Sequence, residues 1–419
     1  MERKIEKFLI HWMNDENRKP LVVYGSKQVG KTYTILSFGR KNFDNVIYID
    51  SSCPKLKEIK KEKTITSLVK FIEEYSSCSI VKGKSLVVFD NVNDVDIVNA
   101  IKTFGKFKND YHIVLITSSR DNLSKFKGVE LQFKSLFPMD FEEYLMSLGK
   151  QELIDFIKAS FKSNTEMPFH LLAMEYFNNY ICTGGMPEAV FSSLSDGNLL
   201  YLNSIFDKVL DIYHKEMSLQ DNLIDVVRCR ESFDSIPMQL VKPNKKFQYG
   251  LIKDGARSKE YESALNFLHN NGFVHKCYKL VDVKSPLNAN KDKDSFRVYL
   301  NDTGILYKKL YLNSALFEEY KNILYENSVA STLANLGYSL QYFQSKGKAE
   351  IDFVIQTKTS SIVPIELVPH NKTKSKALSL FMNTYNSLYG IRITSDNFSI
   401  RGKVRYIPIY ATFCLGSLM

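Results

Sequence analysis

The chain has 419 residues, of which 44% are hydrophobic and 24% are charged. This composition is typical of a globular protein, and the length predicts about two to four domains of ~100–200 residues each. The six cysteines form no CxxC pair, which excludes a disulfide framework and a cysteine-rich zinc site. No apolar stretch approaches the ~20 residues of a membrane span, so we expect a cytoplasmic protein without a membrane partner.

Positive charge is in excess, because 56 Lys and Arg residues outnumber 46 Asp and Glu residues and give a formal net charge of +10. Such an excess favours acidic partners, with nucleic acid first among them. The lysines are scattered along the chain, so general solubility explains the charge equally well. On charge alone, DNA is a candidate partner and no more.

The N-terminal segment has apolar residues at helical spacing. Ile5, Phe8, Leu9 and Trp12 recur with charged residues between them. This pattern predicts an amphipathic helix rather than a signal peptide, which would need an unbroken apolar run. The apolar residues 21–24 then predict a short buried strand.

A complete G-x-x-x-x-G-K-T motif follows that strand, and a helical pattern follows the motif. In this context, the glycines allow backbone N–H groups to surround phosphate oxygens at a helix N-terminus. We expect Lys31 to reach the β- and γ-phosphates of ATP, and the Thr32 hydroxyl to bind Mg²⁺. The predicted nucleotide-binding residues are Gly25, Ser26, Lys27, Gln28, Val29, Gly30, Lys31 and Thr32.

A second apolar segment, residues 85–89, ends on Asp90. At the carboxyl end of a parallel strand this carboxylate would face the phosphate loop, so Asp90 is the second predicted Mg²⁺ ligand. The next residue is Asn91, whose amide can orient a water molecule but cannot take its proton. Asp94 and Asp96 are nearby carboxylates that could act instead.

Two further segments, residues 45–50 and 111–120, also read as strands. Strands alternating with helices predict a parallel, doubly wound sheet. The second segment ends in hydroxyls, and Thr117 and Ser118 are candidates to contact the γ-phosphate or its water. The alternative is that they begin a loop. Arg120 is a candidate phosphate sensor, although a surface role fits it better.

A series of short motifs occurs in order along the chain. They lie at residues 19–32, 111–119, 137–145, 183–190, 296–304, 350–353, 391–394 and 407–410. Over essentially the whole chain, this order resembles the prokaryotic AAA-type ATP-binding proteins that carry a C-terminal domain of unknown function. The resemblance implies an ATPase domain at residues 1–160 and a helical lid over the nucleotide at residues 161–225. It also implies an acidic residue after Asp90, a pattern from which Asn91 departs.

Residues 226–310 contain a helical pattern followed by two strand patterns. The helical face at 261–268 ends before Asn271-Gly272, and strands are predicted at 273–281 and 296–300. A helix followed by a hairpin predicts a winged helix. Basic residues just upstream could contact phosphates, and a protein-interaction wing with solvated lysines is the alternative. These residues are Lys242, Lys245, Lys246, Lys253, Arg257 and Lys259.

Residues 311–419 carry three carboxylates on predicted elements. Glu326 lies on a helix, Asp352 on a strand at 350–355, and Glu366 on a strand at 362–368. This arrangement resembles the restriction-endonuclease-like core, in which such carboxylates bind Mg²⁺.

In that core, a lysine two residues after the last carboxylate stabilises the attacking water and the developing charge. Here that position is Val368, so we predict a degenerate nuclease site. Lys348, Lys358 or Lys374 would have to supply the missing cation from another segment. The basic turn at 371–376 is interpreted as a solvated loop, and the alternative is that Lys372, Lys374 and Lys376 contact nucleic acid.

Together these patterns predict an α/β protein: a P-loop NTPase domain of the AAA type, a helical lid, a winged helix, and a nuclease-like α/β domain at residues 311–419. The predicted function is ATP binding through Lys31, Thr32 and Asp90, with slow hydrolysis coupled to a rearrangement of the C-terminal domains. The alternative is a nucleotide-gated DNA-binding or scaffolding protein without turnover. A metal-dependent nuclease is less favoured, because Val368 removes a group that the chemistry needs.

Partners beyond ATP stay open, and they include DNA, another protein and a second copy of the chain. Self-association would be needed for an arginine finger of the kind that ring-forming ATPases use. The candidate arginines are Arg120, Arg228, Arg230 and Arg257.

Overall fold

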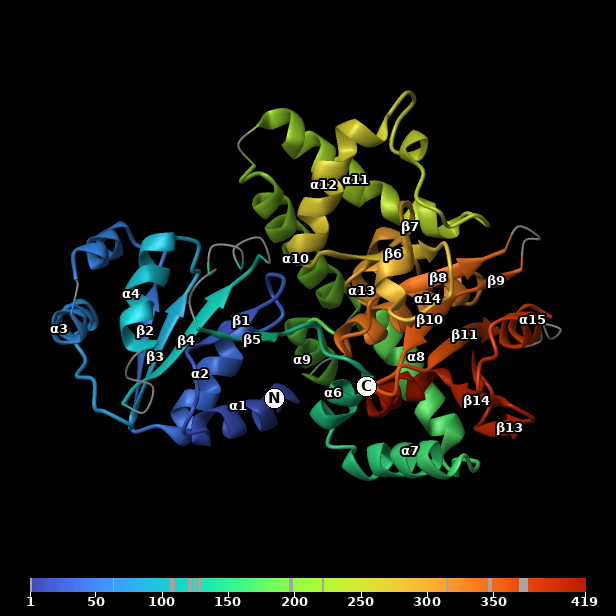
Figure 1. Cartoon of the computed structure of the whole chain (residues 1–419), viewed down its shortest axis with the longest axis horizontal. Helices are drawn as coiled ribbons and strands as arrows, with labels where there is room; N and C mark the ends of the chain where they lie inside the picture. The colour runs from blue at the N-terminus through green and yellow to red at the C-terminus, as the bar shows by residue number, and fades with distance from the viewer. Residues whose placement is uncertain are drawn as a thin grey trace. The chain divides into compact units, whose positions relative to one another are not determined.

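The computed structural model forms two compact units, drawn in Figure 1. The first unit contains residues 1–137 and 270–272, and the second contains 138–269 and 273–419. The residues that the structure describes are 2–62, 64–105, 110–119, 123, 126, 130–195, 199–220, 222–313, 316–345, 349–368 and 376–419.

The first unit is built on the parallel sheet that the sequence predicts. Its strands all pair in parallel. Their order across the sheet is β2 (Asn45–Asp50), β3 (Ser85–Asp90), β4 (His112–Thr117), β1 (Leu21–Tyr24) and β5 (Gln132–Ser135). The sequence analysis did not anticipate β5. Its polar residues suit the edge position that it occupies, and they give no apolar strand signal.

Helices cover both faces of this sheet. Ile47 and Phe89 belong to a buried core with α3 (Ile65–Ser76) and α4 (Val95–Gly105). Alternate strand residues face the other way, where α2 (Lys31–Asn42) packs so closely that a Cβ on Gly39 would lie 2.7 Å from Val46.

The described part of the first unit also contains α1 (Ile5–Asn14) and a 3₁₀ helix, η1 (Pro54–Lys61). The predicted amphipathic character of α1 is confirmed, because Ile5, Leu9 and Trp12 are buried.

The second unit begins with a series of helices that extends beyond both ends of the helical region predicted at residues 161–225. They are α6 (Phe141–Ser147), α7 (Gln151–Ser163), α8 (His170–Thr183), α9 (Pro187–Ser195), α10 (Leu199–Met217) and α11 (Leu223–Val241). The turn between α8 and α9 is tightly packed, since a Cβ on Gly185 would lie 2.0 Å from the carbonyl oxygen of Met139. Asp302 accepts a hydrogen bond of 2.6 Å from the Gly185 N–H. This turn is therefore a structural join within the second unit.

The predicted helix and hairpin are present, with one difference. A short 3₁₀ turn, η2 (Tyr249–Leu251), precedes α12 (Ser258–Asn270), and β6 (Val274–Leu280) then pairs antiparallel with β7. β7 (Lys291–Leu300) begins earlier than predicted, because polar residues at its start conceal it. β6 also pairs in parallel with β8 (Gln341–Gln344), so the hairpin belongs to the sheet β7-β6-β8-β9. The winged helix and the domain boundary at residue 310 stay predictions.

The prediction of one strand at 350–355 is wrong, because Asp352 interrupts it. β9 (Glu350–Ile351) pairs with β8, whereas β10 (Phe353–Gln356) pairs with β11. The sheet that follows has the order β10-β11-β12-β14-β13. Its other strands are β11 (Ile362–Val368), β12 (Gly390–Thr394), β13 (Ser399–Arg401) and β14 (Val404–Pro408).

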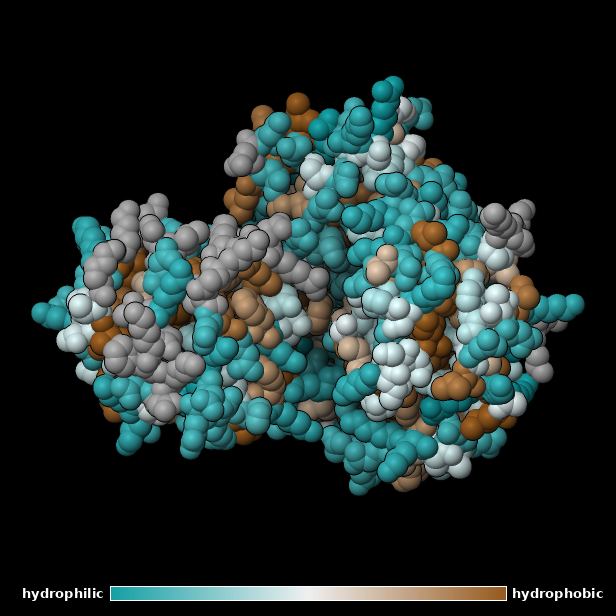
Figure 2. All heavy atoms as spheres, in the orientation of Figure 1, coloured by the Kyte–Doolittle hydropathy of each residue, from teal (hydrophilic) through white to brown (hydrophobic). Residues whose placement is uncertain are grey.

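The described part of the second unit also contains helices and 3₁₀ segments between and after these strands. They are η3 (Leu287–Asn290), α13 (Thr303–Lys309), α14 (Phe317–Asn335), α15 (Ala377–Thr384) and the 3₁₀ helix η4 (Ile409–Leu418). On the face drawn in Figure 2, hydrophilic residues cover most of the surface, and hydrophobic residues form smaller patches. Within the described part of the chain, no helix combines the length and apolar character needed to cross a membrane.

Candidate functional site

The predicted phosphate loop connects the end of β1 at Tyr24 to the start of α2 at Lys31. Gly25 has a φ of +156°, and a Cβ there would lie 2.0 Å from the carbonyl oxygen of Leu136. Gly30 has a φ of +85° and forms the N-cap of α2. Both positions therefore require glycine, the first for a close backbone approach and the second for a left-handed conformation.

Lys31 and Thr32 lie in the first turn of α2. The Lys31 ammonium donates hydrogen bonds of 2.8 Å to the carbonyl oxygens of Gly25 and Ser26. The Thr32 hydroxyl donates a bond of 2.6 Å to Asp90 at the end of β3. The cation thus folds back over the loop, and two hard oxygen donors meet beside it. This donor set fits Mg²⁺, which prefers oxygen ligands and accompanies nucleotide phosphates.

Asp90 belongs to a small network at the carboxyl ends of β2 and β3. The Tyr48 hydroxyl donates to Asp90 over 3.2 Å, and burial together with the Asp90 charge raises the pKa of Tyr48 to about 12. Asn91 has a φ of +57° and donates its side-chain N–H to Asp50 over 3.1 Å. The Asn91 amide is thereby anchored to a carboxylate on the neighbouring strand.

Asp50 is a site residue that the sequence analysis did not single out. It is the register partner of Asp90 in the sheet. Hydrogen bonds from the Ser52 backbone and from Asn91 hold the pKa of Asp50 below its ordinary value, against the effect of burial. The sequence does contain a pattern that could have indicated Asp50. The strand predicted at residues 45–50 ends on an aspartate, as residues 85–90 do.

A pocket of about 240 Å³ lies in front of these groups. Thr117 is placed there by topology, because β4 lies between β1 and β3 and pairs Thr117 with Tyr24. Asp94 is not among the lining residues, and the Asp96 side chain lies outside the described part of the chain. The predicted residues that line the pocket are Lys27, Gln28, Gly30, Lys31, Thr32, Asp90, Asn91, Thr117 and Ser118.

Arg3 forms hydrogen bonds that hold the phosphate loop in place, and no pattern in the sequence predicts this role. Its guanidinium donates to the carbonyl oxygen of Val29 over 3.0 Å and to that of Phe137 over 2.8 Å. Arg3 is buried, and α1 begins two residues later. Val29 itself is buried. The N-terminal segment therefore fixes the back of the phosphate loop.

The predicted nuclease-like carboxylates form a different arrangement in the second unit. Glu326 on α14 is buried and accepts a hydrogen bond of 2.7 Å from the Tyr299 hydroxyl. It also pairs with the Lys245 ammonium and lies 3.5 Å from the Arg297 guanidinium. Although burial opposes it, the charges of Lys245 and Arg297 hold the pKa of Glu326 below its ordinary value.

Asp352 and Glu366 have separate partners. Asp352 accepts a 2.8 Å hydrogen bond from the Leu367 N–H, and burial together with the nearby Glu326 raises its pKa to about 7. Glu366 accepts a 2.7 Å bond from Arg392 Nε, and both of these side chains are buried. Asp352 and Glu326 line one pocket of about 240 Å³, and Glu366 is not among its lining residues.

Lys245 provides the cation that Val368 does not. Both residues line this pocket. Lys358 lies in an exposed turn after β10, while Lys348 and Lys374 are outside the described residues. Lys245 is 81 positions from Glu326, so spacing could not reveal the contact. In the part of the chain that the structure describes, no group of three or more His, Cys, Asp or Glu side chains is placed to hold a metal ion.

Two of the candidate arginines have polar partners on nearby residues, and some of the basic candidates fall outside the described residues. Arg228 lies 3.7 Å from Asp225, and Arg230 donates to the Ser218 hydroxyl over 2.8 Å. Arg120 and residues 371–375 of the basic turn are outside the described residues. The identity of an arginine finger therefore stays undecided.

Comparisons with protein families agree with the geometry of the phosphate loop. Residues 17–145 match the model of the AAA domain, so fold and motif together define a P-loop NTPase domain of the AAA type in this part of the chain. More particularly, the chain combines this domain with a C-terminal domain of unknown function, DUF4143, at residues 321–412. A further domain of unknown function, DUF8612, matches residues 174–316. A search of curated proteins gives no match.

Solved structures show distant similarity. The Walker-type ATPase PABY2304 of Pyrococcus abyssi is 12% identical, with 74% of this chain and 95% of that chain covered and a TM-score of 0.45. The Aeropyrum pernix ORC1 protein in complex with DNA is 14% identical, with 74% of this chain and 90% of that chain covered and a TM-score of 0.29. Drosophila ORC bound to DNA is 12% identical, with 73% of this chain and 94% of that chain covered and a TM-score of 0.26. Similarities of this size carry no information about ligands.

Proposed function

We propose that the protein binds ATP with Mg²⁺ at residues 25–32 and hydrolyses it slowly, and that the nucleotide state switches the C-terminal domains. The observation that carries the proposal is the 2.6 Å hydrogen bond between Thr32 and Asp90, next to an ammonium held by two loop carbonyls. These are the groups that phosphate binding needs, already assembled at a helix N-terminus.

Each group has a defined part in this proposal. Lys31 exchanges the carbonyl oxygens of Gly25 and Ser26 for phosphate oxygens, which costs little because both sets are acceptors at the same site. Thr32 and Asp90 would hold Mg²⁺, which neutralises phosphate charge when bound. Thr117 lines the pocket beside them, where its hydroxyl can contact the γ-phosphate or the attacking water.

Slow turnover follows from the residue beside Asp90. Asn91 can position the attacking water, and its anchoring to Asp50 restricts the direction in which the amide points. Neither nitrogen nor oxygen of an amide accepts a proton at neutral pH, and a general base is typically worth about 10²–10⁴-fold in rate. We therefore expect nucleotide binding to persist while hydrolysis is weak.

The test is binding of Mg-ATP by calorimetry together with steady-state phosphate release. Lys31→Ala should weaken binding roughly 100-fold or more, because it removes a charge-assisted contact to two phosphates. Lys41→Ala is the matched control, since Lys41 is exposed at the far end of the same helix and pairs only weakly with Glu6 at 3.5 Å. Retained ATP affinity in Lys31→Ala would refute the site.

A nucleotide-gated DNA-binding or scaffolding protein without turnover is the second candidate. The anchored amide of Asn91 and the net charge of +10 favour it. Phosphate release measured with and without duplex DNA separates the two candidates, because Lys31-dependent turnover supports only the ATPase. Duplex binding that strengthens as salt falls would support the second candidate, and no binding at low salt would remove it.

A metal-dependent nuclease is less favoured than either. Glu326, Glu366 and Glu350 each pair with a buried or half-buried basic side chain. A metal would have to displace those cations from low-dielectric positions, which is costly. Magnesium-dependent nicking of DNA that is lost in Asp352→Ala would revive this candidate, whereas nicking that persists would show contamination.

A further inference from the structure

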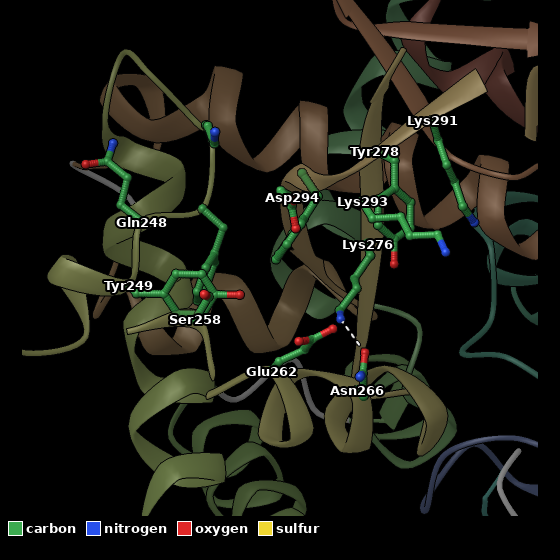
Figure 3. A pocket seen from close by; sticks show the side chains of 13 residues that line it. Gln248, Tyr249, Ser258, Glu262, Asn266, Lys276, Tyr278, Lys291, Lys293 and Asp294 are labelled. Carbon is green, nitrogen blue, oxygen red and sulfur yellow. Dashed lines mark hydrogen bonds between the residues drawn. The ribbon is translucent and has the colours of Figure 1, made fainter. Parts of the chain in front are cut away.

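A pocket of about 550 Å³ in the second unit belongs to neither site described above (Figure 3). One wall is a face of α12, which carries Ser258, Glu262 and Asn266 at intervals of four. The opposite wall is formed by β6 and β7, and residues 246–249 close one end. The volume lies within the ~300–1,000 Å³ typical of ligand sites.

Positive charge dominates the lining of this pocket. It contains four lysines, of which three are Lys276, Lys291 and Lys293, against the carboxylates of Glu262 and Asp294. Lys246 is the fourth. An excess of lysines facing a concave surface attracts anions, and phosphate is an anion that lysine binds as a point charge.

Aromatic rings line the same space. Phe247 stacks on Phe296 with ring centroids 5.8 Å apart and an interplanar angle of 16°. Tyr278 and Tyr249 also contribute to the lining, and Lys291 lies 4.7 Å from the centre of the Tyr278 ring. Aromatic faces next to lysines are the combination that proteins use to bind a base and its phosphate together.

Lys276 is the most buried of the lysines that line this pocket, and its ammonium lies 5.2 Å from the centre of the Phe296 ring. It is only 7% exposed, and it donates a 2.7 Å hydrogen bond to the neutral amide oxygen of Asn266, drawn as the dashed line in Figure 3. Among the residues that the structure describes, no carboxylate lies within ion-pair distance of this ammonium. Burial lowers the pKa of Lys276 to about 8, against the opposing charge of Glu262.

We propose that this pocket binds a nucleotide unit, with its phosphate at Lys276 and the lysines of β7 and its base against the aromatic wall. Two sources share this chemistry: a free nucleoside monophosphate and a single nucleic-acid strand. The site is separate from the phosphate loop, whose lining residues all belong to the first unit. Its failure would therefore leave the proposed ATP binding untouched.

The test is calorimetric titration of the full chain with AMP and, separately, with a short 5′-phosphorylated single-stranded oligodeoxynucleotide. Lys31→Ala serves as the parent, so that the phosphate loop does not contribute. Adding Lys276→Met should weaken binding about tenfold or more, since a charge-assisted hydrogen bond to phosphate is lost. Adding Lys259→Gln should change it less than about twofold, because Lys259 lies on the same helix, is exposed and does not line the pocket.

Binding by AMP alone assigns the pocket to free nucleotide, and binding by the oligonucleotide alone assigns it to a strand. Binding by neither probe overturns the proposal, as does equal weakening by Lys259→Gln and Lys276→Met. If the Lys276→Met variant does not fold, the double change Lys291→Gln with Lys293→Gln tests the same pocket, because these two lysines line it and are less buried than Lys276. It should weaken binding about three- to tenfold.

The pH dependence supplies a readout that a purely structural role would not change. Charged and titratable groups near Lys276 are Glu262 on α12, Lys291, Lys293 and Asp294 on β7, Tyr278 on its own strand, and Lys246 and Tyr249 before α12. A phosphate dianion binds the protonated amine, so affinity should be full near pH 7, where both charges are present, and fall by up to about tenfold per pH unit above about pH 8, as the Lys276 amine with its lowered pKa loses its proton. Lys276→Met should abolish that fall. An unchanged slope in the variant would overturn the assignment of phosphate to Lys276.

Discussion

The phosphate loop of the first unit and the predicted nuclease-like carboxylates of the second contain similar side chains in opposite electrostatic situations. These carboxylates, Glu326, Asp352 and Glu366, are called the carboxylate cluster below. The described hydrogen bonds of Lys31 go to neutral carbonyl oxygens, and Asp90 accepts from the hydroxyls of Thr32 and Tyr48. In the cluster, Glu326 and Glu366 pair with cations from distant segments. A ligand can replace neutral partners at little cost, whereas it must break buried ion pairs to enter the cluster. The phosphate loop can therefore exchange its hydrogen-bond partners for those of a ligand, whereas the carboxylates of the cluster already have their charges balanced by side chains of the protein.

The largest effect should come from breaking an ion pair of the cluster. Arg392→Met leaves Glu366 buried without its cation, so we expect a loss of about 3–5 kcal/mol in the free energy of unfolding. Urea denaturation measures the loss, and Arg401→Met on the exposed edge strand β13 is the control. Changing both partners, Arg392→Met with Glu366→Leu, should recover most of it, because no charge then remains unpaired. A loss below about 1 kcal/mol in the single variant would show that the pair is not satisfied as described.

The second prediction concerns the missing base of the phosphate loop. Glutamate at position 91 would supply a proton acceptor, but it would also face Asp50, which lies 3.1 Å from the present amide. The double change Asn91→Glu with Asp50→Asn removes that repulsion while keeping a hydrogen-bonding partner. We expect steady-state phosphate release to rise by roughly tenfold or more.

Two single variants control this experiment. Asn91→Glu alone should give a smaller gain, since the two carboxylates repel each other and the left-handed backbone at this position disfavours a longer side chain. Asn91→Gln, without a carboxylate, should give none. Equal rates in the wild type and the double variant would mean that proton transfer from water does not limit turnover.

The two regions also differ in how far sequence could predict them. The phosphate loop is one contiguous segment whose glycines fix its conformation, so residues 25–32 and Asp90 could be predicted to lie together before any contact was known. The roles of Asp50 and Arg3 could not be predicted from the sequence. The role of Asp50 depends on which strand lies next to β3, and the role of Arg3 depends on where the N-terminal segment packs. Fold topology decides both, and local spacing does not.

In the second unit, the decisive contacts join residues far apart in the chain. Glu326 meets Lys245 from a segment 81 positions away, and Arg297 comes from β7. Alternation through residues 350–355 suggested one strand, but periodicity does not tell where a strand changes its pairing partner. The break at Asp352 places β9 and β10 in different sheets and brings Asp352 to the pocket with Glu326.

The smallest predicted effect tests that shared pocket through pH. Because the pKa of Asp352 is raised to about 7 from an ordinary value of 3.8, the folded chain keeps a proton there that the unfolded chain releases. Between about pH 4 and pH 7 this group makes stability fall as pH rises, and above pH 7 the loss is constant.

Asp352→Asn removes the titration and keeps an oxygen to accept the Leu367 N–H. Relative to the wild type, the variant should therefore gain about 1–2 kcal/mol between pH 6 and pH 8 in urea denaturation. Asp254→Asn, at an exposed carboxyl in the same unit, should track the wild type at both pH values. If Asp352→Asn tracked it as well, Asp352 would be ionised throughout this range, and burial beside Glu326 would not raise its pKa.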